Sequence, residues 1–125
     1  MDSKLKILIV EDDEFLRSLT AKRLEKEDYT VVAAVDGESA LVTAAQEKPN
    51  LIFLDLLLPG LDGFEVLSKL KANAELKDVP VVIFSNLGQK EDIERAKQLG
   101  ASEFFIKANF TLDDVTVKIN EILRK

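Results

Sequence analysis

Five short apolar runs recur along the chain at fairly even spacing. They cover residues 7–10, 31–34, 51–54, 81–84 and 104–106. Each run is rich in β-branched or aromatic residues and is shorter than a typical helix, which is characteristic of strands buried on both faces of a sheet. The pattern therefore predicts five strands, each buried on both faces of the sheet.

The segments between these runs place their apolar residues at helical spacing, which predicts five amphipathic helices. The residues expected to face the core are Phe15, Leu16, Leu19 and Leu24; Ala40, Leu41, Ala44 and Ala45; Phe64, Leu67 and Leu70; Ile93 and Ala96; and Val115, Ile119, Ile122 and Leu123. Asp36-Gly37 and Asp62-Gly63 precede helices, and Gly100 follows one as a C-cap glycine would. Thr111 and Asp114 have the spacing of a capping box for the last helix.

Strands that alternate with helices indicate parallel strands joined by right-handed crossovers. We therefore expect an α/β fold: a doubly wound, three-layer (βα)5 sandwich with a five-stranded parallel sheet in the order 2-1-3-4-5. In such sheets ligands bind outside the carboxyl ends of the strands. The residues that directly follow each strand are therefore the candidates for function.

Composition narrows the class of protein. The 125 residues suit one hydrophobic core, so residues 1–125 are expected to form a single domain with no output domain. Cysteine and histidine are absent, which excludes disulfides, the Ser-His-Asp triad and the usual zinc ligands. A formal charge of −6 argues against direct nucleic-acid binding. The N-terminus has no signal-peptide or membrane-spanning run, so we expect a cytoplasmic protein without a membrane partner.

Acidic residues follow two of the predicted strands. Glu11-Asp12 follow the first strand, where they would also suit a helix N-terminus, and Asp55 follows the third within an apolar stretch. A carboxylate among apolar neighbours must be paired or coordinated. Strands 1 and 3 are adjacent in the predicted sheet, so Glu11, Asp12 and Asp55 should converge. Oxygen-only ligands favour a hard cation, Mg²⁺ by preference, with Mn²⁺ or Ca²⁺ as alternatives.

Ser85 follows the fourth predicted strand and Lys107 follows the fifth, on the same edge of the sheet. Taken singly, a loop serine and a surface lysine are ordinary features. Together with the acids and a cation they describe a phosphoryl site. Asp55 would attack phosphorus and form an acyl phosphate. Lys107 would neutralise the phosphoryl oxygens, and Ser85 would donate a hydrogen bond to one of them.

The ordered set of residues resembles the receiver domains of two-component response regulators over essentially the whole chain. The matching features are Glu11-Asp12, Asp55 followed by Pro59-Gly60-Leu61-Asp62-Gly63, Ser85 and Lys107, all at the family's spacing. The resemblance implies a flavodoxin-like fold. It also implies a signalling switch that is no enzyme in the usual sense, because it catalyses only its own phosphorylation and dephosphorylation.

The resemblance implies specific roles at the metal site. Asp55 would be the phosphoacceptor. Asp12, Asp55 and the backbone carbonyl of Leu57 would contact Mg²⁺, with Mn²⁺ as an alternative, and Glu11 would bind the ion through water.

The resemblance also implies a switch and its partners. Ser85 and Phe104 match the family's switch pair: phosphate draws the hydroxyl inward, and the aromatic ring turns into the space. That movement would reshape the face of helix 4, strand 5 and helix 5. The implied phosphodonor is a histidine kinase or a phosphotransfer protein. A downstream protein would bind the reshaped face, and a phosphorylation-dependent homodimer fits the same family.

Four positions depart from the usual family pattern, among them Asn86, which stands where a small residue is typical. Ala108 replaces the usual cis proline after the lysine, and a cis bond before a non-proline residue costs roughly 2.5 to 4 kcal/mol, which leaves the isomer of the Lys107–Ala108 bond open. Leu57 and Leu87 are bulky and apolar and flank the position from which water would attack. We therefore expect slow self-dephosphorylation.

Three other functions remain as alternatives. A receiver-like interaction module would use the same surface without being phosphorylated, which Ala108 favours and the intact acid set disfavours. An aspartyl phosphohydrolase would need a second Asp two residues after its nucleophile, where this chain has Leu57. A flavodoxin-like flavin protein would need a Ser/Thr-rich phosphate loop where this chain has four acids, at 11–14.

Overall fold

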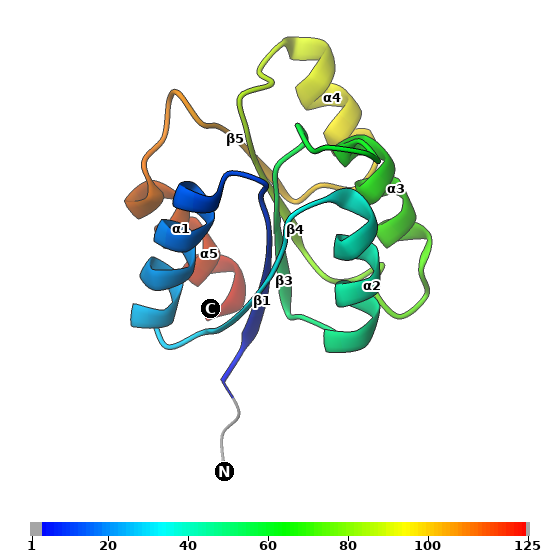
Figure 1. The fold of residues 1–125 in the computed structure, drawn as a ribbon. Coiled ribbons are helices and arrows are strands. Elements are labelled where there is room, and N and C mark those ends of the chain that lie inside the picture. The colour runs from blue at the N-terminus through cyan, green and yellow to red at the C-terminus, as the bar shows by residue number, and fades with distance from the viewer. Residues whose placement is uncertain (1–3, 125) are drawn as a thin grey trace.

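Five parallel strands form one sheet at the centre of the molecule (Figure 1). The computed structural model describes residues 4–124, so the two ends of the predicted 1–125 domain lie outside the described residues. The strands are β1 (Lys6–Val10), β2 (Thr30–Ala34), β3 (Leu51–Leu54), β4 (Val81–Ser85) and β5 (Glu103–Ile106). Their order is β2-β1-β3-β4-β5, and every pairing is parallel, as predicted.

Helices cover both faces of the sheet (Figure 1). They are α1 (Glu14–Lys26), α2 (Gly37–Glu47), α3 (Gly63–Ala72), α4 (Lys90–Gln98) and α5 (Leu112–Leu123). In Figure 1, α1 and α5 lie on one side of the sheet, and α2, α3 and α4 lie on the other. This arrangement confirms the predicted three-layer, doubly wound α/β fold.

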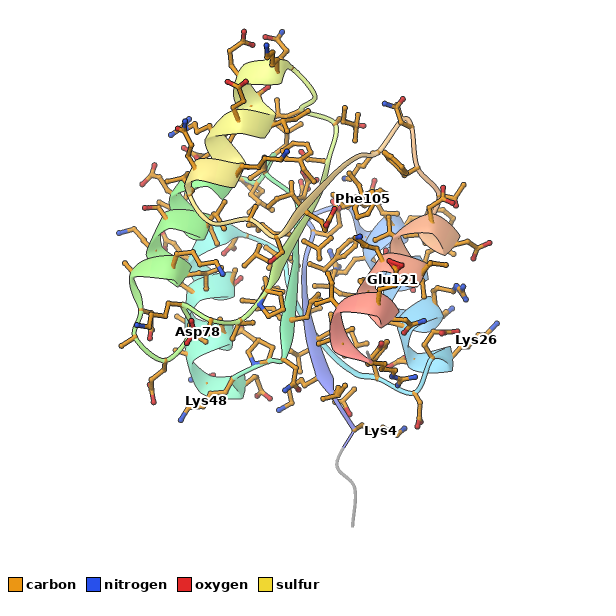
Figure 2. All side chains as sticks on the ribbon, turned by 180° about the vertical axis from the view of Figure 1, so that it is seen from behind. Lys4, Lys26, Lys48, Asp78, Phe105 and Glu121 are labelled. Atoms are coloured by element: carbon orange, nitrogen blue, oxygen red, sulfur yellow. The ribbon has the colours of Figure 1, made fainter. Side chains whose placement is uncertain are left out.

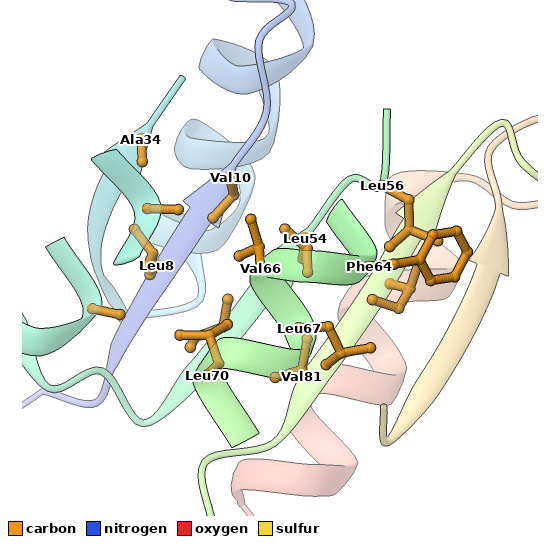
Figure 3. Close-up of a cluster of buried hydrophobic side chains, with 14 of the residues drawn as sticks. Leu8, Val10, Ala34, Leu54, Leu56, Phe64, Val66, Leu67, Leu70 and Val81 are labelled. Atoms are coloured by element: carbon orange, nitrogen blue, oxygen red, sulfur yellow. The ribbon is translucent and has the colours of Figure 1, made fainter. Parts of the chain in front are cut away.

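The three central strands, β1, β3 and β4, bury side chains on both faces, because successive residues of a strand point in opposite directions. On the side of α2, α3 and α4, Leu8, Val10 and Leu54 pack against Val66 and Leu67 (Figure 3). The intervening strand residues contribute to a second cluster with α1 and α5. Burial on both faces explains why these three strands read as continuous apolar runs rather than alternating ones.

The edge strands β2 and β5 are less buried than predicted, because within residues 4–124 each has a neighbouring strand on one side only. Thr30 and Ala33 of β2 are exposed, and Phe105 is the one buried residue of β5.

Aspartate caps begin the first three helices at the same edge of the sheet where β1 and β3 end. Asp13, Asp36 and Asp62 each accept the backbone N–H three residues on, at 2.8 to 3.1 Å. The predicted capping box of α5 is also formed, with Thr111 and Asp114 exchanging side-chain and backbone hydrogen bonds. These caps fix where the loops above the strands end.

The apolar pattern of α1 was interpreted wrongly. Phe15 is 75% exposed and Leu19 is 42% exposed, although both were expected to face the core. Leu24 is buried and Leu16 half-buried, as expected, and Thr20 is the other buried residue of this helix. The Thr20 hydroxyl donates to the Leu16 carbonyl at 2.8 Å, so a polar residue occupies a core-facing position without an unpaired donor.

The other helices bury the expected sides with one exception. In α2, Ala40 and Ala44 are buried, whereas Ala45 is exposed.

Charged side chains lie on both sides of the molecule. Figure 2 shows Lys26 with the α1–α5 side and Asp78 with the α2–α3 side. Among residues 4–124, no helix is both long and apolar enough to cross a membrane.

Candidate functional site

The register of the sheet brings the acids of two loops together. Val10 and Leu54 are partners in the β1–β3 ladder, so the next residues, Glu11 and Asp55, leave adjacent strands side by side. The Asp55 N–H donates to the Val10 carbonyl at 3.0 Å, which extends the ladder by one bond. The Glu11 N–H donates to the Ala34 carbonyl at 3.1 Å on the other side. The backbone of the sheet therefore fixes the positions from which the Glu11 and Asp55 side chains project.

Glu11, Asp12 and Asp55 form one cluster of carboxylates, as the topology predicted. One oxygen from each lies within 4.8 Å of the others. Glu11 is 2% exposed and Asp55 is 4% exposed, whereas Asp12 is exposed to solvent. Oxygen ligands from carboxylates alone suit a hard divalent cation rather than a soft one. The donor set therefore fits the magnesium or manganese site expected from the sequence.

Lys107 bridges the two buried acids. Its Nζ atom lies 2.7 Å from Asp55 Oδ2 and 2.8 Å from Glu11 Oε1. Burial lowers the pKa of Lys107, but the hydrogen bonds to Asp55 and Glu11 more than offset this effect, so the pKa lies above its usual value. Burial raises the pKa of Glu11, even though the hydrogen bond from Lys107 opposes the change. Lys107 is thus a permanent cation at neutral pH.

The second oxygen of each buried carboxylate accepts a backbone N–H. Leu57 N donates to Asp55 Oδ1 at 3.0 Å, and Asp13 N donates to Glu11 Oε2 at 3.1 Å. Each carboxylate is therefore held from two sides, by an ammonium and by a peptide group. Such bonds to ionised oxygens are stronger than neutral ones and keep the reactive atoms in one orientation.

Ser85 ends β4 and is fully buried. Its hydroxyl accepts the Leu87 N–H at 3.4 Å, and its carbonyl accepts the Lys107 N–H at 2.9 Å. Phe104 pairs with Ile83 in the β4–β5 ladder, two residues before Ser85. Because residues two apart on a strand share a face, Ser85 and Phe104 point to the same side of the sheet. Phe104 is half-buried against the cluster beneath α3 and α4.

The loop after β5 is ordered without the usual cis proline. The Lys107–Ala108 bond is trans, as is every other peptide bond between residues 4 and 124. The Asn109 N–H donates to the Ile106 carbonyl at 2.9 Å. Phe110 stacks edge-on against Phe105, with ring centroids 4.9 Å apart. Lys107 therefore reaches the acids from a trans backbone.

Sequence reasoning missed Arg17, which lies beneath the loop that carries Glu11 and Asp12. Its Nη1 atom donates to the Glu11 carbonyl at 2.9 Å and to the Asp12 carbonyl at 3.3 Å. The only signal in the sequence is a basic residue in the first turns of a helix, where positive charge is unfavourable. That signal is too weak to indicate a partner.

The family that matches this sequence is consistent with the geometry of the site. The family described as the response regulator receiver domain matches residues 7–120. The chain therefore belongs to the receiver domains of response regulators, the signalling modules of two-component systems. The resemblance seen in the sequence is confirmed.

Individual relatives extend the comparison. The DNA-binding dual master transcriptional regulator RpaA of Synechocystis sp. is 35% identical over 120 residues, which are 96% of this chain and 49% of RpaA. The chain thus spans about half the length of the curated relatives first matched.

Two solved structures show the same fold. The BeF₃-activated receiver domain of Klebsiella pneumoniae RstA has a TM-score of 0.87 and 31% identity, covering 96% of this chain and 99% of that one. The Mn²⁺-bound form of the response regulator Rcp1 has a TM-score of 0.81 and 31% identity, covering 95% of this chain and 93% of that one.

Proposed function

We propose that this receiver domain is a phosphorylation-controlled switch in which Asp55 accepts a phosphoryl group in a Mg²⁺-dependent reaction. As the family suggests, the proposed donor is a histidine kinase or a phosphotransfer protein; residues 1–125 have no histidine of their own to supply the group. One observation carries the proposal: the nearly buried Asp55 carboxylate contacts the Lys107 ammonium and belongs to a cluster of three acids at the strand ends. Burying a carboxylate in such surroundings lowers the stability of the fold. Carboxylates in environments of this kind are common at reactive sites.

The reaction is a phosphoryl transfer from nitrogen to oxygen. A carboxylate oxygen of Asp55 attacks phosphorus as the phosphorus–nitrogen bond of a phosphohistidine breaks, and the departing imidazole nitrogen keeps the electron pair. The product is an acyl phosphate on Asp55. Lys107, now 2.7 Å from Asp55 Oδ2, is close enough to follow the negative charge onto the phosphoryl oxygens.

The metal ligands are proposed to be Asp12, Asp55 and the backbone carbonyl of Leu57, with Glu11 acting through water. A bound divalent cation would supply positive charge that offsets the phosphoryl oxygens. Mg²⁺ is proposed over Mn²⁺ because it prefers one or two carboxylates together with phosphate oxygens. The Mn²⁺-bound Rcp1 structure supports a divalent cation of this size class.

Ser85 and Phe104 are proposed as the switch pair. The Ser85 hydroxyl accepts the Leu87 N–H, so its own hydrogen can serve a phosphoryl oxygen on Asp55. Movement of Ser85 toward the phosphate would free space on the face that Phe104 shares. Phosphate thereby favours one of two arrangements of the side chains, which is a population shift.

The face of α4, β5 and α5 is proposed as the output surface. β5 is an edge strand, and Val117 on α5 is 59% exposed. Lys118 joins α5 to β5 through an ion pair of 3.6 Å with Glu103, beside this apolar side chain. We propose a protein partner here, and a phosphorylation-dependent homodimer through the same face, rather than nucleic acid, because the chain carries a net charge of −6.

Intact-mass spectrometry after incubation with acetyl phosphate and Mg²⁺ tests the proposal. We expect one phosphoryl adduct, lost in Asp55→Asn and in samples treated with a chelator. Asp78→Asn is the matched control, because Asp78 is an exposed aspartate on the α2–α3 side (Figure 2). It should accept phosphate like the unsubstituted protein.

Two results would reject the switch. An adduct that persists in Asp55→Asn would place the phosphate elsewhere. No adduct with any small-molecule donor or with beryllofluoride would favour the alternative, a receiver-like interaction module that acts without phosphorylation.

A further inference from the structure

Arg17 occupies an unusual place on α1. The helix begins after Asp13, whose carboxylate accepts the Leu16 N–H at 3.0 Å and whose carbonyl accepts the Arg17 N–H at 2.9 Å. Arg17 therefore lies in the first turns, at the positive end of the helix dipole. A cation is disfavoured there, so its position calls for a local reason.

The guanidinium binds the main chain of the loop that carries the acids. Its Nη1 atom lies 2.9 Å from the Glu11 carbonyl oxygen and 3.3 Å from the Asp12 carbonyl oxygen. β1 ends at Val10, so these two carbonyls lie beyond the strand and need other donors. Both bonds come from the single Nη1 amino group, whose two hydrogens can serve two neighbouring oxygens. Arg17 thus holds the loop where the strand ends.

Arg17 differs from Lys107 in the atoms that it contacts. Lys107 donates to the carboxylate oxygens of Glu11 and Asp55 and so lies on atoms that a metal would use. Arg17 donates only to carbonyl oxygens, which leaves the carboxylates free for a cation. It also adds a charge that does not titrate, since a guanidinium stays protonated in proteins. The contact can therefore brace the acids without competing with an ion.

We propose that Arg17 is a positioning residue for the metal site, bracing the backbone of Glu11 and Asp12 so that the exposed Asp12 carboxylate is directed at the ion. The proposal rests on the metal-dependent function given above. Groups that orient metal ligands from behind typically change metal affinity by about tenfold to a hundredfold when removed.

Titration calorimetry with Mg²⁺ alone tests the proposal on the full chain. Arg17→Met keeps an apolar stem and removes both hydrogen bonds, so we expect its Mg²⁺ affinity to fall about tenfold or more. Arg17→Lys keeps the charge, but its ammonium is carried on a shorter side chain than the Nη1 group, so about a threefold loss is expected. Lys22→Met is the matched control, because it removes the same charge from an exposed position of α1 and should bind like the unsubstituted protein.

The melting temperature without metal is the second readout, because a merely structural role would lower it and leave the Mg²⁺ affinity unchanged. Equal affinities for Arg17→Met and Lys22→Met would overturn the proposal. If Arg17→Met does not fold, Arg17→Gln takes its place, and an unchanged Mg²⁺ affinity in that variant overturns the proposal equally. If the unsubstituted protein takes up no Mg²⁺, the metal-dependent function itself is overturned, and this inference falls with it.

Discussion

At the scale of single residues, the fold takes two carboxylates of one site almost fully out of water. Glu11 and Asp55 share one ammonium, that of Lys107, whose side chain is only 15% exposed. Burying charges costs free energy that their mutual attraction does not reliably return. The cluster is therefore better explained by reactivity than by stability.

The raised pKa of Glu11 predicts a pH dependence of stability. Burial raises this pKa above 4.5, so the native protein holds the proton more tightly than the unfolded chain does. The stability from this group is present below the unfolded pKa and is lost as the pH rises through the native pKa. We expect the free energy of unfolding without metal to lose this contribution above about pH 4.5, and Glu11→Gln to lack the loss.

Urea unfolding of both proteins over a series of pH values gives the measurement. The difference between the two profiles isolates Glu11 from the other carboxylates. A difference that does not change with pH would contradict the prediction.

The side chain of Leu57 is expected to influence how long Asp55 stays phosphorylated. This side chain is 49% exposed beside Asp55 and offers no group that could hold an attacking water. We expect slow hydrolysis of the Asp55 phosphate, and a rate several-fold higher in Leu57→Asn, because an amide can orient water. Decay followed on phosphate-affinity gels measures both rates. Val42→Asn, at another exposed apolar position, is the control and should decay like the unsubstituted protein.

At the scale of elements, the end of α2 contains a strained residue. Lys48 adopts the left-handed conformation, with φ 47° and ψ 62°, which favours glycine. We expect Lys48→Gly to stabilise the protein by about 0.5 to 1 kcal/mol. Its ion pair with Glu75 is largely exposed and contributes little. Chemical denaturation measures the change. Lys48→Ala, which loses the same ion pair but keeps the strain, should bring no gain.

α4 is the helix with the fewest buried residues in the part of the chain described. Ala96 is its one fully buried residue, and the Arg95 guanidinium stacks 4.2 Å from the Phe64 ring centroid on α3. A helix held by so few contacts can shift at low cost. This light packing supports the proposed output face.

The strands could be predicted to within one residue, and the helices only in part. A strand buried on both faces must be apolar throughout, so its limits are visible in the sequence. α1 broke the rule for helices, because Phe15 and Leu19 are exposed while Thr20 is buried. Periodicity cannot distinguish an apolar residue of the core from one left on the surface.

The site was predictable where the backbone decides it. Parallel topology alone places Glu11 beside Asp55, whichever rotamers the side chains adopt. The bonds of Arg17 to two carbonyls depend on the reach of a long side chain, and no local pattern encodes them. The sequence likewise left the isomer of the Lys107–Ala108 bond undecided, and the structure shows that it is trans.

At the scale of the whole molecule, a ligand bound only by the native state stabilises all of it. We expect Mg²⁺ to raise the free energy of unfolding, by about 2.7 kcal/mol at a concentration a hundred times its dissociation constant. Asp55→Asn should lose most of this gain, because it removes one acid of the cluster. Thermal melting with and without Mg²⁺ is the measurement, and equal gains in both proteins would contradict the proposed ligand set.

The shared ammonium of Lys107 has a consequence for the molecule as a receiver of signals. A positive charge already placed between Asp55 and Glu11 repels an arriving cation, yet the same charge attracts an arriving phosphoryl group. Lys107→Met should therefore bind Mg²⁺ more tightly and form the acyl phosphate more slowly, by about tenfold or more. Binding of the metal ion and acceptance of the phosphoryl group thus make opposite demands on one side chain, and the presence of Lys107 favours phosphorylation.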